Sequence, residues 1–192
     1  MAALPQIGEE YLPCILAVAI CFVSSMNNMT SVSVSLEGKS LWFLKSVPAD
    51  VKNIFFGKVM LHILITGIPL FIAAVIISTA FGFGILTFIL FTLFAEVFMT
   101  LCAMTGLMVN LIFPKTDWIN EASAVKQSIS ALIGMFAGLF YSIILILAFY
   151  AFSAFVPPTV FFISVTMLLL LLNVLIYKWL VTVGVKKFMA LK

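Results

Sequence analysis

Few side chains in this sequence have the chemistry of a catalytic group. The chain holds seven acidic residues, one histidine (His62) and no arginine. Glu96 is the only acidic residue inside an apolar stretch, and neither a second carboxylate nor an HExxH pattern accompanies it. General acid–base catalysis and metal-assisted hydrolysis need several groups that act together. We therefore expect a protein that is not an enzyme and that has no catalytic residue or metal site.

Two Gly-Lys pairs resemble the end of a phosphate-binding loop but lack its beginning. The loop GxxxxGK[ST] needs a glycine five residues before the Gly-Lys pair. Ser33 stands at that position for the pair at 38–39, and Lys52 stands there for the pair at 57–58. We expect no cofactor in this chain.

The three cysteines, Cys14, Cys21 and Cys102, all lie within apolar stretches. They form neither a CxxC pair nor a cluster with His62 at the spacing of a zinc site. Free cysteines in apolar surroundings behave as small hydrophobic residues. We expect these three to serve packing.

The composition predicts a membrane protein. Of the 192 residues, 65% are hydrophobic and 9% are charged, and the mean hydropathy is +1.31. A soluble domain carries roughly a quarter charged residues. The low charge excludes a soluble enzyme, a nucleic-acid-binding module and a disordered chain. The lipid bilayer is therefore an expected partner, and nucleic acid is not.

Five apolar stretches are each long enough to cross a bilayer as a helix, which needs about 20 residues. Transmembrane β-strands would be about half as long and would alternate polar with apolar residues. We predict an all-α polytopic membrane protein with one transmembrane domain over residues 1–192. The predicted spans are 11–31, 58–80, 85–113, 129–155 and 159–183, with loops at 35–57 and 114–128.

Glycine and proline separate the predicted spans. The FGFG sequence at 81–84 permits a tight reversal, because glycine adopts positive φ angles without strain. Pro114 ends the third span, and the Pro-Pro pair at 157–158 separates the fourth from the fifth. Asn120 is the predicted N-cap of the fourth helix.

The lysines indicate the orientation, because basic residues favour the cytoplasmic side of a membrane. The N-terminal segment carries Glu9 and Glu10 and has no lysine. We therefore expect the N-terminus outside and the C-terminus inside the cell, with loops 35–57 and 114–128 in the cytoplasm. The ten lysines are Lys39, Lys45, Lys52 and Lys58, then Lys115 and Lys126, then Lys178, Lys186, Lys187 and Lys192.

The loop at 35–57 combines apolar and basic residues in the manner of a short helix in the membrane interface. A second helix is expected to start near Ser46 and Pro48, with Asp50 in its first turn. The interfacial helix has two interpretations. It either anchors the loop in lipid or carries a contact with another protein.

Both loops carry sequences similar to those of the permease subunits of bacterial type-2 ABC exporters. The first loop has Ser-x-Glu-Gly-Lys, Leu-Trp, Lys-Ser-x-Pro and Gly-Lys, as in the coupling region of these permeases. The second has Phe-Pro-Lys-x-Asp-Trp and then Ala-Val-Lys-Gln. The residues that carry the resemblance include Glu37, Gly38, Lys39, Leu41, Trp42, Lys45 and Pro48, and in the second loop Pro114, Lys115, Asp117 and Trp118.

The resemblance implies that the first loop docks a separate subunit, which binds the ATP. Glu37 is then expected to pair with a basic group or to cap backbone amides of that subunit. The resemblance also implies a second permease half or copy and a location in the plasma membrane of a bacterial cell. A core unit of this family has six helices, and its coupling loop follows the second helix. Here the loop follows the first, which implies that the chain corresponds to helices two to six. The alternatives are an ATP-independent carrier or channel, or a permease fragment without activity.

Polar residues inside the spans are the other candidates for function, because they are costly in lipid. Glu96 either contacts a substrate along the transport path or forms a hydrogen bond between helices. His62 is expected at the membrane interface. Asn110 and Asn173 are expected to form hydrogen bonds between helices.

Small residues recur every four positions in the fourth span, where they would let another helix approach closely. This ridge serves either packing within the chain or an interface with another permease half or copy. Its members are Ser130, Gly134, Gly138 and Ser142.

The orientation can be tested with cysteines introduced one at a time and an impermeant thiol reagent on intact cells. We expect a cysteine at Ser40 or Thr116 to stay unlabelled and one at Gly84 or Ser153 to be labelled. Labelling at Ser40 from outside would contradict the predicted orientation.

Overall fold

The computed structural model describes residues 11–118, 120–152 and 155–191, which form helices and connecting loops without a strand. Ser153 lies outside these residues. Within the described residues, five candidate membrane spans are long and apolar enough to cross a bilayer. The prediction of an all-α polytopic membrane protein is confirmed.

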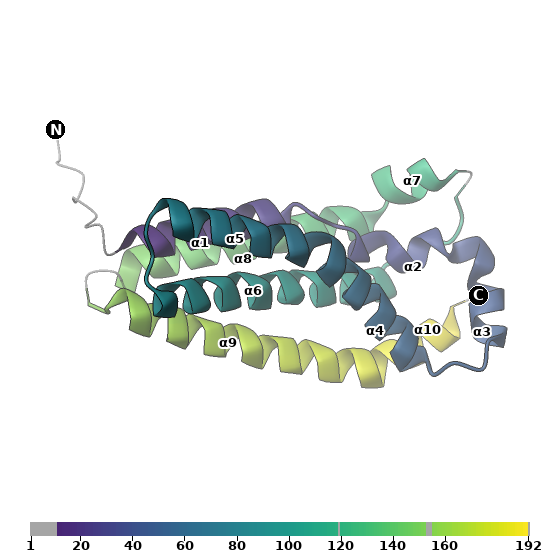
Figure 1. Cartoon of the computed structure of the whole chain (residues 1–192). Helices are drawn as coiled ribbons and strands as arrows, with labels where there is room; N and C mark the ends of the chain where they lie inside the picture. Colours follow the sequence, from purple (N-terminus) through teal and green to yellow (C-terminus); the bar gives the residue numbers. More distant parts are fainter. Residues whose placement is uncertain (1–10, 119, 153–154, 192) are drawn as a thin grey trace.

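The first span is a helix followed by a series of short turns. Figure 1 shows these turns, with α3, α7 and α10, gathered at one end of the bundle, which we call the α3 end. The elements are α1 (Leu12–Ser25), η2 (Thr30–Val32), α2 (Ser33–Leu36), η3 (Gly38–Ser40) and α3 (Leu41–Ser46).

The other spans are longer helices, two of which contain a wide π-helical turn. The chain runs through α4 (Val51–His62), the π turn η4 (Ile63–Gly67), α5 (Ile68–Ala80) and α6 (Ile85–Ile112). It continues through α7 (Glu121–Lys126), α8 (Ile129–Phe152), α9 (Pro158–Trp179), the π turn η5 (Leu180–Gly184) and α10 (Val185–Ala190).

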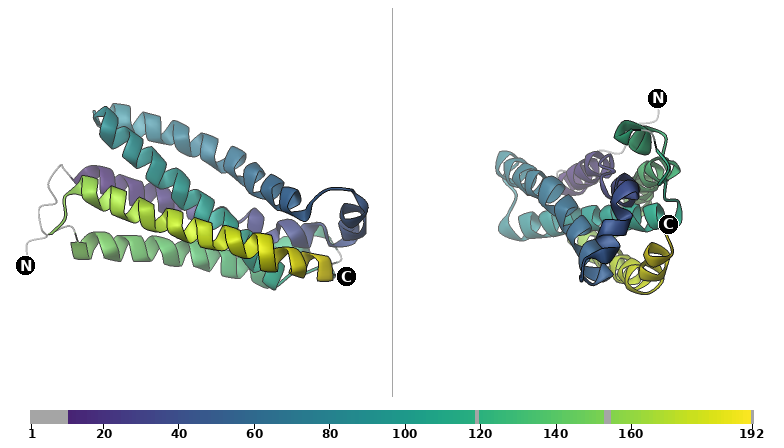
Figure 2. Two further views of the ribbon diagram at one scale, coloured as in Figure 1. Left: turned by 90° about the horizontal axis from the view of Figure 1, so that it is seen from below. Right: turned by 90° about the vertical axis from the view of Figure 1, so that its right-hand side faces the viewer.

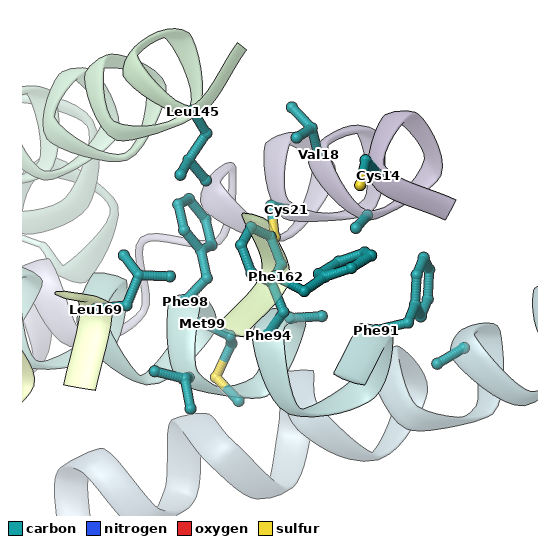
Figure 3. Close-up of a cluster of buried hydrophobic side chains, with 14 of the residues drawn as sticks. Cys14, Val18, Cys21, Phe91, Phe94, Phe98, Met99, Leu145, Phe162 and Leu169 are labelled. Carbon is teal, nitrogen blue, oxygen red and sulfur yellow. The ribbon is translucent and has the colours of Figure 1, made fainter. Parts of the chain in front are cut away.

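Helix α6 lies at the centre and packs against α1, α5, α8 and α9 (Figure 2). Its aromatic side chains fill the space between its neighbours. The rings of Phe94 and Phe162 meet edge to face with centroids 5.5 Å apart. Cys14 and Cys21 are fully buried against the same cluster (Figure 3), as expected of packing residues.

The outward faces of the helices are apolar, as lipid contact requires. On α8 the exposed side chains include Phe136, Phe140, Ile143 and Leu147. An apolar face of this size on a soluble protein would mark an interaction site. Here the apolar face is expected, because the helices are surrounded by the hydrocarbon of the bilayer.

The turns confirm several local predictions. Gly82 has a φ of +66°, so the FGFG sequence makes the expected reversal between α5 and α6. Pro158 is the first residue of α9, and α6 ends at Ile112, just before Pro114.

Two predicted helix starts are wrong. Asp50 does not lie in the first turn of a helix that begins near Ser46; it is the N-cap of α4, where its carboxylate accepts a hydrogen bond from the Lys52 amide. The reason is Pro48, which forces the preceding residue, Val47, into an extended conformation. Asn120 likewise caps the separate short helix α7 and not α8, because α7 ends at Lys126 before α8 begins.

Candidate functional site

A buried amide joins the central helix to the first loop. Asn110, near the C-terminal end of α6, has no exposed surface. Its Oδ1 accepts hydrogen bonds from the backbone amides of Val34 (2.7 Å) and Ser35 (3.1 Å). Its Nδ2 donates to the hydroxyls of Ser35 (2.7 Å) and Ser130 (2.9 Å). One side chain thus holds together α6, α2 and α8.

The contact with α2 has a local cause. The first amides of a helix have no intrahelical acceptor. Val34 and Ser35 lie in the first turn of α2, whose preceding residue, Val32, supplies no side-chain cap. Asn110 provides the missing acceptor from a residue far away in the sequence.

Ser35 also binds the second loop. Its hydroxyl accepts a hydrogen bond from the Lys115 amide (2.9 Å). Its carbonyl accepts one from the indole Nε1 of Trp118 (2.8 Å). The two sequences that carry the family resemblance are therefore in direct contact.

Two further contacts hold the loops together. The ammonium of Lys39 lies 4.5 Å from the centre of the Trp118 ring, a cation–π arrangement. A Cβ added to Gly38 would lie 2.8 Å from the carbonyl oxygen of Thr116. Only glycine allows this approach of one loop backbone to the other.

Glu37 makes its ion pair within the chain. Its Oε2 lies 2.6 Å from the Nζ of Lys58 on α4, and Lys58 also donates to the carbonyl of Ser33 (3.1 Å). We expected Glu37 to pair with a partner subunit. The structure gives it an internal partner, because α4 packs against η2, and Lys58 then reaches both Ser33 and Glu37.

Helix α3 is attached on one side and open on the other. Leu41 is 2% exposed and belongs to a core cluster that also contains Phe55 and Phe188. Lys45 donates to the carbonyls of Met189 (3.1 Å) and Leu191 at the end of α10.

The open side of α3 is aromatic. The side chains of Trp42 and Phe43 are 73% and 56% exposed, and their rings meet edge to face with centroids 6.0 Å apart. Pro48 follows in the exposed connection to α4. The loop sequence thus presents apolar surface at the tip of the bundle.

Glu96 lies midway along α6 and is partly exposed. A Cβ added to Gly67, in the π turn η4, would lie 2.9 Å from its Oε2. Among the described residues, none donates a hydrogen bond to the carboxylate. Glu96 is therefore separate from the contacts at the α3 end.

The other polar candidates within the spans, His62, Asn110 and Asn173, are buried. His62 is 1% exposed, and neither of its ring nitrogens has a hydrogen-bond partner among the described residues. Asn173 on α9 donates to the carbonyl of Val97 on α6 (3.1 Å), and so both Asn173 and Asn110 join helices as predicted.

The small-residue ridge of α8 packs within the chain. A Cβ added to Gly138 would lie 2.9 Å from the backbone oxygen of Ser25, at the end of α1. A Cβ added to Gly134 would lie closer still to a neighbour, the hydroxyl oxygen of Ser31 in η2. The hydroxyls of Ser130 and Ser142 are buried on the same face.

Sequence comparison assigns the chain at the level of a family. Residues 7–178 match the model of a family described as "Membrane protein of 12 TMs". No match was found among curated proteins or among solved structures.

Loss of the Asn110 amide should destabilise the protein. In Asn110→Ala, buried donors and acceptors on α2 and α8 lose their partner, which costs about 1–3 kcal/mol. We expect the free energy of unfolding in detergent to fall by that amount. The matched control is Asn53→Ala, whose side chain is exposed. Equal stability of the two variants would contradict a structural role for Asn110.

Proposed function

Because the chain belongs to this family of membrane proteins with 12 transmembrane segments, we propose that it is the permease subunit of an ATP-driven exporter. In this proposal the α3 end faces the cytoplasm and docks a separate ATP-binding subunit. The chain contributes to the substrate path together with a second permease half or copy.

The observation that carries the proposal is the contact between the two resembling loops. They lie 83 positions apart at the hydrogen bond from Trp118 to Ser35, yet they form one unit at the α3 end. A loop that only anchored the chain in lipid would not need to be fixed to a second loop. A docking element does, because it must transmit displacement to the helices.

Three connections would transmit such a displacement from the loops. Asn110 connects α2 to the central helix α6. The Glu37–Lys58 ion pair connects the segment before η3 to α4. Lys45 connects α3 to α10. Movement of a docked ATPase would therefore reach three spans.

The exposed pair of Trp42 and Phe43 is the best candidate for the docking contact. Large aromatic side chains are enriched among the residues that dominate binding energies. Glu37 is not part of this contact, since its carboxylate is engaged by Lys58. The ammonium of Lys39 lies over the Trp118 ring and so helps to hold the first loop against the second loop.

Glu96 is the candidate for substrate contact in this proposal. A partly exposed carboxylate midway through a membrane must meet protein, water or a polar ligand. Its distance from the α3 end fits a path through the bundle and not a docking role.

Trp42→Ala should weaken the complex with the ATPase. After mild cross-linking in native membranes, the tagged chain should co-purify with a subunit that carries a GxxxxGK[ST] sequence. Loss of an aromatic anchor costs about 2 kcal/mol or more, so the yield of that subunit should fall several-fold. The control is Phe155→Ala, an exposed aromatic residue beyond the other end of α8.

An unchanged yield in Trp42→Ala would contradict docking through α3. If no such subunit is recovered with the wild-type chain, the exporter proposal is wrong and the alternative of an ATP-independent carrier replaces it.

A further inference from the structure

A cavity of about 370 Å³ opens between α4, α6 and the junction of α9 with η5. Figure 1 shows α4 crossing beside α9 and α10 at this point. The volume falls within the range of small-molecule sites. The cavity is apart from Glu96 and from the contacts between the two loops.

The cavity is apolar within the membrane and polar at its rim. The wall residues from α4 and α6 include Phe56, Met60 and Met104, and Tyr177 comes from α9. The rim is formed by Asp50, Lys52 and Asn53 at the start of α4. The second candidate span, Val51–Ala80, starts beside this rim, so a membrane ligand would have its polar part at the rim and its apolar part against the walls.

Both π turns of the described chain contribute to the cavity. Ile63 is the first residue of η4, and Leu180 and Val181 begin η5. A π turn interrupts the regular helical ladder and is frequent at functional sites. The two irregular turns therefore flank one space, although they lie on different helices.

The rim carries a pair of opposite charges. Lys52 is exposed, and among the described residues it forms no ion pair. One oxygen of the Asp50 carboxylate accepts a hydrogen bond from the Lys52 amide, and no hydrogen bond from the described residues engages the other. A headgroup with a phosphate and an ammonium would complement this pair.

We propose that the cavity binds a zwitterionic glycerophospholipid, with an acyl chain between α4 and α9. The phosphate lies at Lys52 and the ammonium at Asp50. The acyl chain contacts Met60 and Met104. This inference is independent of the proposed function, since it requires only that the α3 end lie at a membrane surface.

Native mass spectrometry of the purified full chain, released from micelles that contain phosphatidylethanolamine, tests the proposal. We expect one retained lipid. Lys52→Glu should lower the fraction of protein that retains lipid about fivefold or more, because an attractive contact with the phosphate becomes repulsive. Met60→Trp should lower it similarly by filling the cavity.

Each variant has a matched control on the same chain. Lys186→Glu reverses an exposed lysine on α10, away from the cavity rim. Leu64→Trp places the same bulk one turn further along, at an exposed position outside the cavity lining. Both controls should retain lipid at the wild-type level. Reductions no larger than those of the controls, or equal retention of phosphatidylglycerol, would overturn the proposal.

Discussion

The hydrogen bonds of the Asn110 amide are the interaction on which the α3 end depends. A buried amide without partners costs several kcal/mol in an apolar medium. Here every polar atom of the side chain is engaged, by two backbone amides and by the hydroxyls of Ser35 and Ser130. The cost of burial therefore acts as a constraint, because a shift of α2 or α8 relative to α6 would leave buried groups of Asn110 without partners.

The remaining contacts of the α3 end follow from that arrangement. Fixing Ser35 places its hydroxyl and carbonyl toward the second loop, where Lys115 and Trp118 bind them. Fixing α2 brings Glu37 to Lys58 on α4. Helix α3 is then held against the core by Leu41, and its aromatic side remains exposed. The two loops, fixed to each other and to the spans, with exposed aromatic residues at their tip, are suited to transmit movement between a partner and the spans.

Local features could be predicted from the sequence, and long-range contacts could not. The five spans and the turn at Gly82 follow from apolar length and from backbone geometry, which neighbouring residues determine. The ion pair of Glu37 could not be predicted, because its partner, Lys58, is brought near only by the folding of the loop onto α4. The burial of His62 could not be predicted either, because it depends on which face of α4 meets the core. Asn110 was expected to join helices, yet its partners on α2 have no signature in the sequence.

Amide-resolved hydrogen exchange on the wild-type chain tests the central claim most directly. If Asn110 and Ser35 hold the two loops, the amides of Val34, Ser35 and Lys115 should exchange slowly, although they lie near the end of the bundle. The neighbouring amides of Thr116 and Asp117, which make no hydrogen bond within the described residues, should exchange quickly and serve as the internal reference. Exchange of Val34, Ser35 and Lys115 at the rate of Asp117 would contradict the account.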